Sequence, residues 1–260
     1  MSSILTNASA MTALQTLYLT NRNLATTQDR IATGQRVSTA TDNAAYWSIA
    51  TGMRTQNSAL SAVKDGLGLG ASVVDTAYTA LNDAIKKAQD IHAKYVARAT
   101  PGTDTAVIDA DIAQSKAAVL DIANGATFQG VNLLLTASTD QAVVTGYTAG
   151  TGVTTMTVTK FDLQAALATA DTAALVETAI NNMKAAAAGL GSAKTRSNTQ
   201  QSFTSNLMDA IDRGIGQLVD ADMNAESARL SALQVQQQLG IQALSIANSA
   251  NQGILALFRG

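Results

Sequence analysis

The sequence contains no cysteine, one proline and few aromatic residues. The absence of cysteine excludes a disulfide framework and any metal site built on thiolates. Proline breaks helix interiors, and because Pro101 is the only one, long uninterrupted helices are expected. Aromatic residues make up 4% of the chain, and most apolar residues are Ala, Leu, Ile and Val, which favours thin helices packed side by side.

Charged residues are also scarce, at 14% of the chain against roughly a quarter in an average globular domain. The net charge of −2 includes no basic surplus, which argues against binding to nucleic acid. No run of about 18 apolar residues is present, so insertion into a membrane is not expected. The first positive residue is Arg22, and the residues before it lack the order of a secretory signal peptide, so we expect no cleaved signal.

Both ends of the chain are free of charge. No charged side chain occurs from Met1 to Asn21 or from Leu230 to Phe258. Charged groups are costly to bury and usually face water, so segments without them are expected to be buried in something. Their many Ser, Thr, Asn and Gln residues exclude a helix that faces lipid. We therefore predict that both ends pack in a crowded assembly of protein helices.

The same two ends carry apolar residues on a helical seam of 3.5-residue spacing. We predict that the seam contacts neighbouring subunits, the simpler alternative being a core within the chain; its residues are Leu14, Leu17, Leu24, Ile31, Leu230, Leu233, Leu244, Ile254 and Phe258. The intervening positions would fix register and partner number, and they hold Asn21, Gln28, Gln237, Gly240 and Asn251. A second apolar row indicates several neighbours and consists of Val235, Leu239, Ile246 and Leu257.

The middle of the chain predicts long helices. Apolar residues spaced alternately by three and four positions predict a helix over Ala44–Ala99, roughly 80 Å long, which the turn at Thr100–Gly102 ends. A second helix is expected to start near Thr105. A third is expected over Thr172–Val219, with Phe203 among its inward residues.

One short segment predicts β structure. Asp140–Lys160 is rich in Thr, Gly and Val, and Val153–Thr159 alternates β-branched residues, so we expect a small hairpin there. The fold class that follows is mainly α: a long antiparallel coiled-coil rod with the hairpin, near residues 136–165, at the end distal to the termini. Residues 1–43 and 220–260 would form one coiled coil, and residues 44–219 the core of the rod.

The sequence offers no set of residues for catalysis. His92 is the only histidine and has no partner for acid–base or metal chemistry. The glycines of Gly66–Gly70 follow no strand, so they indicate close helix packing rather than a phosphate loop. We expect no enzyme activity, no cofactor and no metal.

A polar cluster near the last helix imitates the start of a calcium loop, but Ala225 and Ser231 stand where that loop needs glycine and glutamate. Two interpretations stay open for these polar residues: contacts between subunits, or a solvated turn. The residues predicted as polar assembly contacts are Arg36, Asp42, Asn43, Asp220 and Asp222.

Motifs at both ends resemble those of the bacterial flagellins. The run Ile31–Val37 (IATGQRV), followed by Ala40–Ala45 (ATDNAA), is similar to the N-terminal signature of that family. Leu218–Met223 (LVDADM), Ala243–Asn248 (ALSIAN) and Ile254–Arg259 (ILALFR) resemble the C-terminal signature. The resemblance covers roughly residues 1–135 and 175–260.

The resemblance implies a structural subunit of the extracellular flagellar filament, with the terminal helices forming an inner coiled coil along the filament channel. The partners it implies are other copies of the chain, the hook-associated junction proteins, the cap, a secretion chaperone on the C-terminal helix and the flagellar type III export apparatus. The uncleaved N-terminus agrees with that export route. The large variable outer domains of longer flagellins have no counterpart here.

One departure from the family concerns recognition by the vertebrate innate receptor for flagellin. Many flagellins carry Leu-Gln-Arg-Val-Arg-Glu-Leu where this chain has Ala88–Lys94 (AQDIHAK). Asp90 replaces the first arginine and Ala93 the glutamate, so the resemblance implies weak recognition.

Two other functions stay open at this point. A hook–filament junction protein would share the helical ends, although the extensive C-terminal match and the short middle favour the filament subunit. A soluble helical binding module should carry charged surfaces at its ends, and this chain does not.

Overall fold

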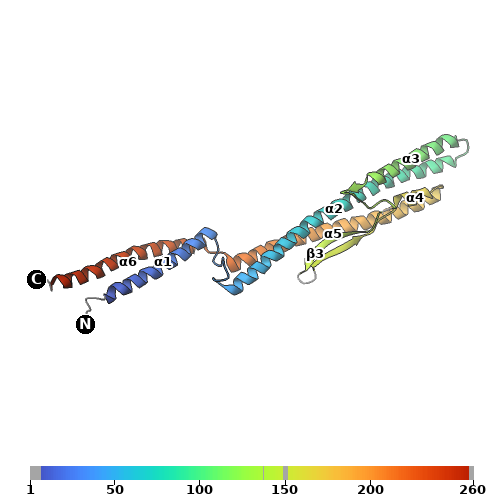
Figure 1. The fold of residues 1–260 in the computed structure, drawn as a ribbon. Coiled ribbons are helices and arrows are strands. Elements are labelled where there is room, and N and C mark those ends of the chain that lie inside the picture. The colour runs from blue at the N-terminus through green and yellow to red at the C-terminus, as the bar shows by residue number, and fades with distance from the viewer. Residues whose placement is uncertain (1–6, 137, 149–151, 258–260) are drawn as a thin grey trace. The chain divides into compact units, whose positions relative to one another are not determined.

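The computed structural model describes residues 7–136, 138–148 and 152–257, with the side chains of 250–257 not included. The chain divides into two compact units, the first made of residues up to Arg54 and from Asp212 onward, the second of Thr55–Ile211. The elements are α1 (Ala8–Thr33), α2 (Ala44–Arg98), α3 (Thr105–Gly125), β1 (Thr127–Phe128), β2 (Val131–Asn132), β3 (Gln141–Thr148), β4 (Gly152–Val158), α4 (Leu163–Ala168), α5 (Ala173–Val219) and α6 (Met223–Leu257) (Figure 1). The prediction of a mainly helical chain with one small hairpin is confirmed.

The first unit is built on α1 and α6, which run side by side in opposite directions (Figure 1). The side chain of Asn7 accepts a hydrogen bond from the backbone N–H of Ala10 and thereby caps the start of α1. Gly34 ends α1 at φ +69°, a left-handed conformation that glycine adopts without steric cost. The short link that follows leads into α2.

The second unit packs α3, the β hairpins and α4 against the long pair α2 and α5. Its core contains Leu81, Val119, Leu134, Leu163 and Met183, all fully buried. The two long helices are antiparallel, since Lys194 forms an ion pair with Asp75 and Lys64 lies 3.5 Å from the hydroxyl of Ser205. The helix boundaries agree with the predicted ones to within one residue.

The β3–β4 hairpin lies along α2 rather than at the tip of the second unit. Its strands pair antiparallel, with a bulge between Val144 and Gly146. A methyl group added at Gly70 would overlap Val143 of β3, so the glycine lets the strand approach the helix. The glycines were expected to serve close packing between helices, whereas Gly70 allows close packing against a strand. The hairpin does belong to the unit that lacks the termini.

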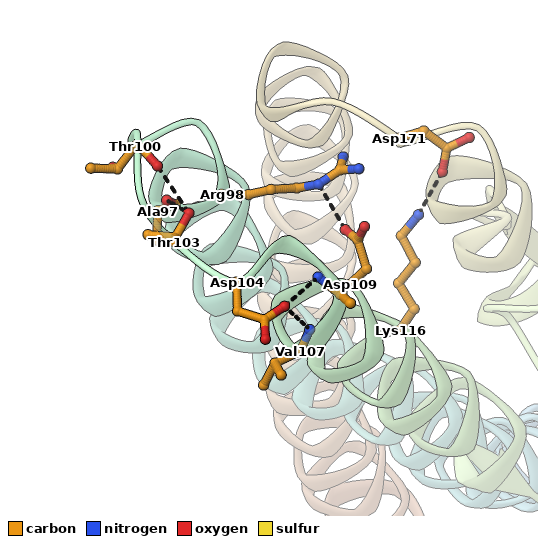
Figure 2. A network of polar contacts seen from close by, with 10 residues as sticks. Ala97, Arg98, Thr100, Thr103, Asp104, Val107, Asp109, Lys116 and Asp171 are labelled. Atoms are coloured by element: carbon orange, nitrogen blue, oxygen red, sulfur yellow. Dashed lines mark hydrogen bonds and ion pairs between the residues drawn. The ribbon is translucent and has the colours of Figure 1, made fainter.

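The turn between α2 and α3 lies at one end of the second unit (Figure 1), and Figure 2 shows the polar contacts around it. The hydroxyl of Thr103 donates to the carbonyl of Thr100 at 2.9 Å, and Asp104 caps α3. Arg98 Nε lies 2.8 Å from Asp109 Oδ1 and joins the two helices. These contacts show why the chain reverses where Pro101 ends the long helix.

The structure corrects the prediction for Phe203, which is 56% exposed rather than inward. Thr204 is 1% exposed and occupies the inward position beside it.

The short pair β1–β2 and the helix α4 were not predicted, because two-residue strands and a six-residue helix carry too little periodic pattern. Within the described residues, no helix is long and apolar enough to cross a membrane.

Candidate assembly site on the terminal helices

A regular seam joins α1 and α6. We define it by the positions of each helix that lose most of their exposure: Ala10, Ala13, Leu17, Thr20, Leu24, Thr27 and Ile31 of α1, and Glu226, Leu230, Leu233, Gln237, Gly240, Leu244 and Ala247 of α6. The spacing alternates between three and four residues, as in a coiled coil. Each helix thus contacts the other through one narrow stripe of residues, and the remaining faces of both helices take no part in the contact.

Most of the predicted contact residues lie in this seam. They are Leu17, Leu24, Ile31, Leu230, Leu233 and Leu244. Leu14 does not belong to it and is 60% exposed. The side chain of Ile254 and the whole of Phe258 lie outside the described residues.

The intervening seam positions of α1 were placed one residue too late. Thr20 and Thr27 are buried there, whereas Asn21 and Gln28 are exposed. The hydroxyl of Thr20 donates to the carbonyl of Thr16 at 2.9 Å, so this polar group is satisfied within its own helix. Threonine can therefore fill a buried seam position that apolar periodicity does not reveal. On α6, Gln237 and Gly240 lie where the periodicity places them.

Polar contacts set the register of the pair. Asn7 Nδ2 donates to the carbonyl of Ala247 at 2.9 Å, and Gln237 Nε2 donates to Asn21 Oδ1 at 2.8 Å. A methyl group added at Gly240 would lie 3.3 Å from Leu17 Cδ1, so the glycine accommodates that leucine. A shift of one helix along the other would break all of these contacts.

The seam ends at a largely buried ion pair. Arg30 Nη1 lies 3.2 Å from Glu226 Oε1, and the two side chains are 27% and 11% exposed. Glu226 Oε2 is buried and accepts no hydrogen bond from the described part of the chain. Arg229 lies farther away, at 3.9 Å, and is 62% exposed. Arg30 is thus the main compensation for a carboxylate that is mostly removed from water.

The two interhelix links are joined to each other by hydrogen bonds. The backbone N–H groups of Arg36 and Val37 both donate to the carbonyl of Val219, at 2.6 and 3.2 Å. The guanidinium of Arg36 donates to the carbonyl of Leu218 at 3.1 Å. Gln35 and Asp220 form an isolated antiparallel bridge. The α1–α2 link is therefore tied to the α5–α6 link.

Each residue predicted as a polar assembly contact has a partner within the chain. Arg36 and Asp220 bind in the links described above, and Asn43 caps α2 by accepting from the N–H of Tyr46 at 3.1 Å. Asp222 caps α6 by accepting from the N–H of Asn224 at 2.9 Å. These contacts explain the residue types by local structure, and a further role between subunits stays a prediction.

Asp42 is the hub of the first link. Its Oδ2 accepts hydrogen bonds from the N–H and the hydroxyl of Thr39, at 2.9 and 3.1 Å, and from those of Ser38, at 3.1 and 3.2 Å. These donors, those of Thr39 first, favour the ionised carboxylate and lower the pKa of Asp42 below its ordinary value of 3.8.

We expect the lowered pKa of Asp42 to make the free energy of unfolding depend on pH in the acid range. Because this pKa is lower in the folded than in the unfolded chain, its stabilisation is complete above pH 3.8 and is lost as the pH falls through the folded pKa. The stability difference between the chain and Asp42→Asn should therefore shrink in that acid range. Carboxyl NMR titration checks the pKa directly, and a midpoint at or above 3.8 would contradict the argument.

Outside the seam, the terminal helices expose large apolar side chains. Those at least half exposed are Met11, Leu14, Tyr18, Leu19, Val235, Leu239, Ile241 and Ile246. A surface groove of about 600 Å³ on α1 is lined by Met11, Leu14 and Tyr18. Among the described residues, no group of three His, Cys, Asp or Glu side chains is placed to hold a metal ion. The chemistry available here is apolar contact with other helices.

Comparison with known families agrees with this arrangement. A family model described as the bacterial flagellin N-terminal helical region matches residues 4–139, and one described as the C-terminal helical region matches residues 173–258. The chain belongs to the bacterial flagellin family. The matches include every terminal and long helix, and they leave out the segment with the β3–β4 hairpin and α4.

Individual flagellins match over their whole length. The chain is 49% identical to a flagellin of Brucella melitensis, 40% to flagellin C of Rhizobium meliloti and 35% to flagellin A of Rhizobium meliloti, each comparison covering all of both chains. The alignments run over 284, 320 and 395 positions, so these flagellins carry insertions relative to the 260 residues here.

The protein is a structural subunit of the bacterial flagellar filament, and it acts in motility. Its family self-assembles into that filament outside the cell. No comparison favours the alternative of a hook–filament junction protein.

Proposed function

We propose that this flagellin assembles through its terminal helices, residues 1–43 and 220–260, which form the inner coiled coil of the filament while residues 44–219 form the wall around it. The observation that carries the proposal is the exposure of eight large apolar side chains on α1 and α6. Large apolar side chains gathered on exposed helix surfaces mark an interaction site in soluble proteins. The seam between α1 and α6 leaves these side chains free for other copies.

The absence of charged side chains from both ends of the chain supports the proposal that the terminal helices lie among other subunits inside the filament. Charged groups buried between subunits would need partners, whereas Ser, Thr, Asn and Gln can be satisfied locally. The hydroxyls of Thr12, Thr16 and Thr20 each donate to a carbonyl four residues earlier in α1, at 2.9 to 3.0 Å. A helix satisfied in this way can be covered by neighbouring helices at little electrostatic cost.

The resemblance to flagellins extends the proposal to further partners. These are other copies of the chain, the hook-associated junction proteins and the cap. A secretion chaperone covers the C-terminal helix before export, which proceeds through the flagellar type III apparatus. No catalytic role is proposed.

Deletion of both ends tests the assembly proposal. The full chain and a version lacking residues 1–43 and 220–260 are compared by sedimentation and negative-stain electron microscopy after short filament seeds are added. We expect long filaments from the full chain and soluble monomers from the truncated one, whose second unit keeps its core. Filaments formed by the truncated chain, or a full chain that stays monomeric, would refute the proposal.

We also propose weak recognition by the innate receptor for flagellin. Asp90 is 62% exposed on α2, close to Lys87 at 3.8 Å, and Ala93 is exposed on the same helix. The double variant Asp90→Arg, Ala93→Glu restores the charges of the family motif. Because a like-charge contact costs several kcal/mol, we expect it to activate a receptor-reporter cell at roughly tenfold lower concentration or less. Full activation by the unchanged chain, or an equal gain from Asp209→Arg on α5, would contradict this.

A further inference from the structure

The exposed apolar residues of α1 and α6 divide into two sets by their position relative to the seam. On α1, Leu14 and Tyr18 each follow a seam residue, and Met11 follows Ala10. On α6 the order is reversed, since Leu239 precedes Gly240 and Ile246 precedes Ala247. Successive residues of a helix turn by about 100°, so a residue after the seam and a residue before it point to different sides.

The antiparallel pairing places the two sets on opposite sides. Two antiparallel helices are related by a two-fold axis perpendicular to both, so residues that follow the seam share one side of the pair and residues that precede it share the other. Ile241 follows Gly240 and joins the α1 set, and Leu19 precedes Thr20 and joins the α6 set. We name these sets face A (Met11, Leu14, Tyr18, Ile241) and face B (Leu19, Leu239, Ile246). Val235 lies two residues from the nearest seam positions on either side, points away from the seam and belongs to neither face.

The two faces lie at the same height along the pair. Leu17 is opposite Gly240, and Asn7 is opposite Ala247, so Tyr18 is level with Leu239 and Met11 is level with the residues just before Ala247. Both faces are uncharged and are at least half exposed. The groove on α1 is lined by the three α1 residues of face A together with Ala8, Thr12 and Gln15, and no residue of face B lines it.

We propose that face A of one copy packs against face B of the next copy, and the inference rests on the assembly proposed above. A contact between two different faces is heterologous, and it continues from copy to copy in a ring or an open helical polymer. Face A paired with another face A would close after two copies. Equal height lets the contact between face A and face B form without a shift along the helices.

Cross-linking within filaments tests the pairing. The chain has no cysteine, so Leu14→Cys on face A and Leu239→Cys on face B provide unique sites. The two variants, with different tags, are polymerised together and treated with a short bismaleimide. We expect dimers that join Leu14→Cys to Leu239→Cys. Dimers of like variants in equal amount, or filaments without any of these dimers, would overturn the inference.

Complementation provides the second measurement. Tyr18→Lys damages face A and Leu239→Lys damages face B, and circular dichroism verifies that both variants keep their helices. Each variant alone should lose filament formation, and a mixture should form heterodimers in analytical ultracentrifugation. Self-association of either variant alone would show that like faces pair and would refute the inference. Val107→Lys, at an apolar residue of α3 that is 64% exposed, is the matched control and should polymerise.

The two proposals fail in distinguishable ways. If the unchanged chain forms no filaments on seeds, the assembly through the ends fails. If filaments form but contain no contact between Leu14→Cys and Leu239→Cys, only the pairing of faces A and B fails.

Discussion

Arg30→Met is expected to lower the free energy of unfolding of the first unit by about 2–3 kcal/mol, because it leaves the carboxylate of Glu226 without its main partner. Glu226 is 8% exposed and its Oε2 has no hydrogen bond within the described chain, so water replaces the lost arginine poorly. Breaking a fully buried pair costs roughly 3–5 kcal/mol, and the 27% exposure of the Arg30 side chain reduces that figure.

Trp47 makes this measurement specific to the first unit. It is the only tryptophan of the chain and lies in the part of α2 that belongs to that unit. Urea unfolding followed by tryptophan fluorescence therefore reports on the unit that contains the ion pair. The matched control is Arg229→Met, which removes the more distant and 62% exposed arginine from the same carboxylate and should cost less than about 1 kcal/mol. Equal losses for the two variants would contradict the argument.

Gly70→Ala is expected to destabilise the second unit by about 1–3 kcal/mol, although alanine normally favours helices. The added methyl group would overlap Val143, whose branched side chain has few rotamers to move into. Val143 is 3% exposed and packs in the core, so the hairpin as a whole must shift away from α2. Thermal unfolding monitored by circular dichroism measures the loss.

Gly68→Ala is the matched control, two residues away in the same helix. A methyl group at Gly68 would meet nothing within 4 Å, so the substitution should stabilise the helix by roughly 0.5–1 kcal/mol. The changes in the free energy of unfolding have opposite signs in the two variants only if the contact with β3 determines the effect at Gly70. A gain in stability for Gly70→Ala would show that the hairpin is not held against the helix there.

The long helices could be read from the sequence because several independent signals agree. Apolar spacing, the scarcity of proline and the turn at Pro101 all predict α2, and its observed end at Arg98 is one residue from the predicted end. The hairpin was predicted because β-branched residues alternate over Val153–Thr159 within a segment rich in Thr and Gly. Strand β4 (Gly152–Val158) covers most of Val153–Thr159. Local pattern is sufficient where an element is long or strongly alternating.

The seam of α6 was predicted more accurately than that of α1, for a physical reason. The α6 positions Leu230, Leu233 and Leu244 are apolar and regular, so periodicity finds them. On α1 the buried positions between the leucines are Thr20 and Thr27. Threonine is moderately polar and occurs at both buried and exposed positions, so its presence in the sequence does not predict burial. The same limit explains Thr204, which is buried where Phe203 was expected.

The sequence by itself determined that this chain is a helical, uncharged-ended subunit of the flagellin type, because composition, periodicity and motifs are properties of neighbouring residues. Only the tertiary structure decided which side chains are used inside the subunit and which remain outside it. Two such contacts are the ion pair of Arg30 with Glu226 and the hydrogen bond of Gln237 with Asn21, each between residues about 200 positions apart in the chain. Faces A and B likewise combine residues from the two ends of the chain. Such contacts depend on the register in which α1 pairs with α6, and no local pattern contains that register.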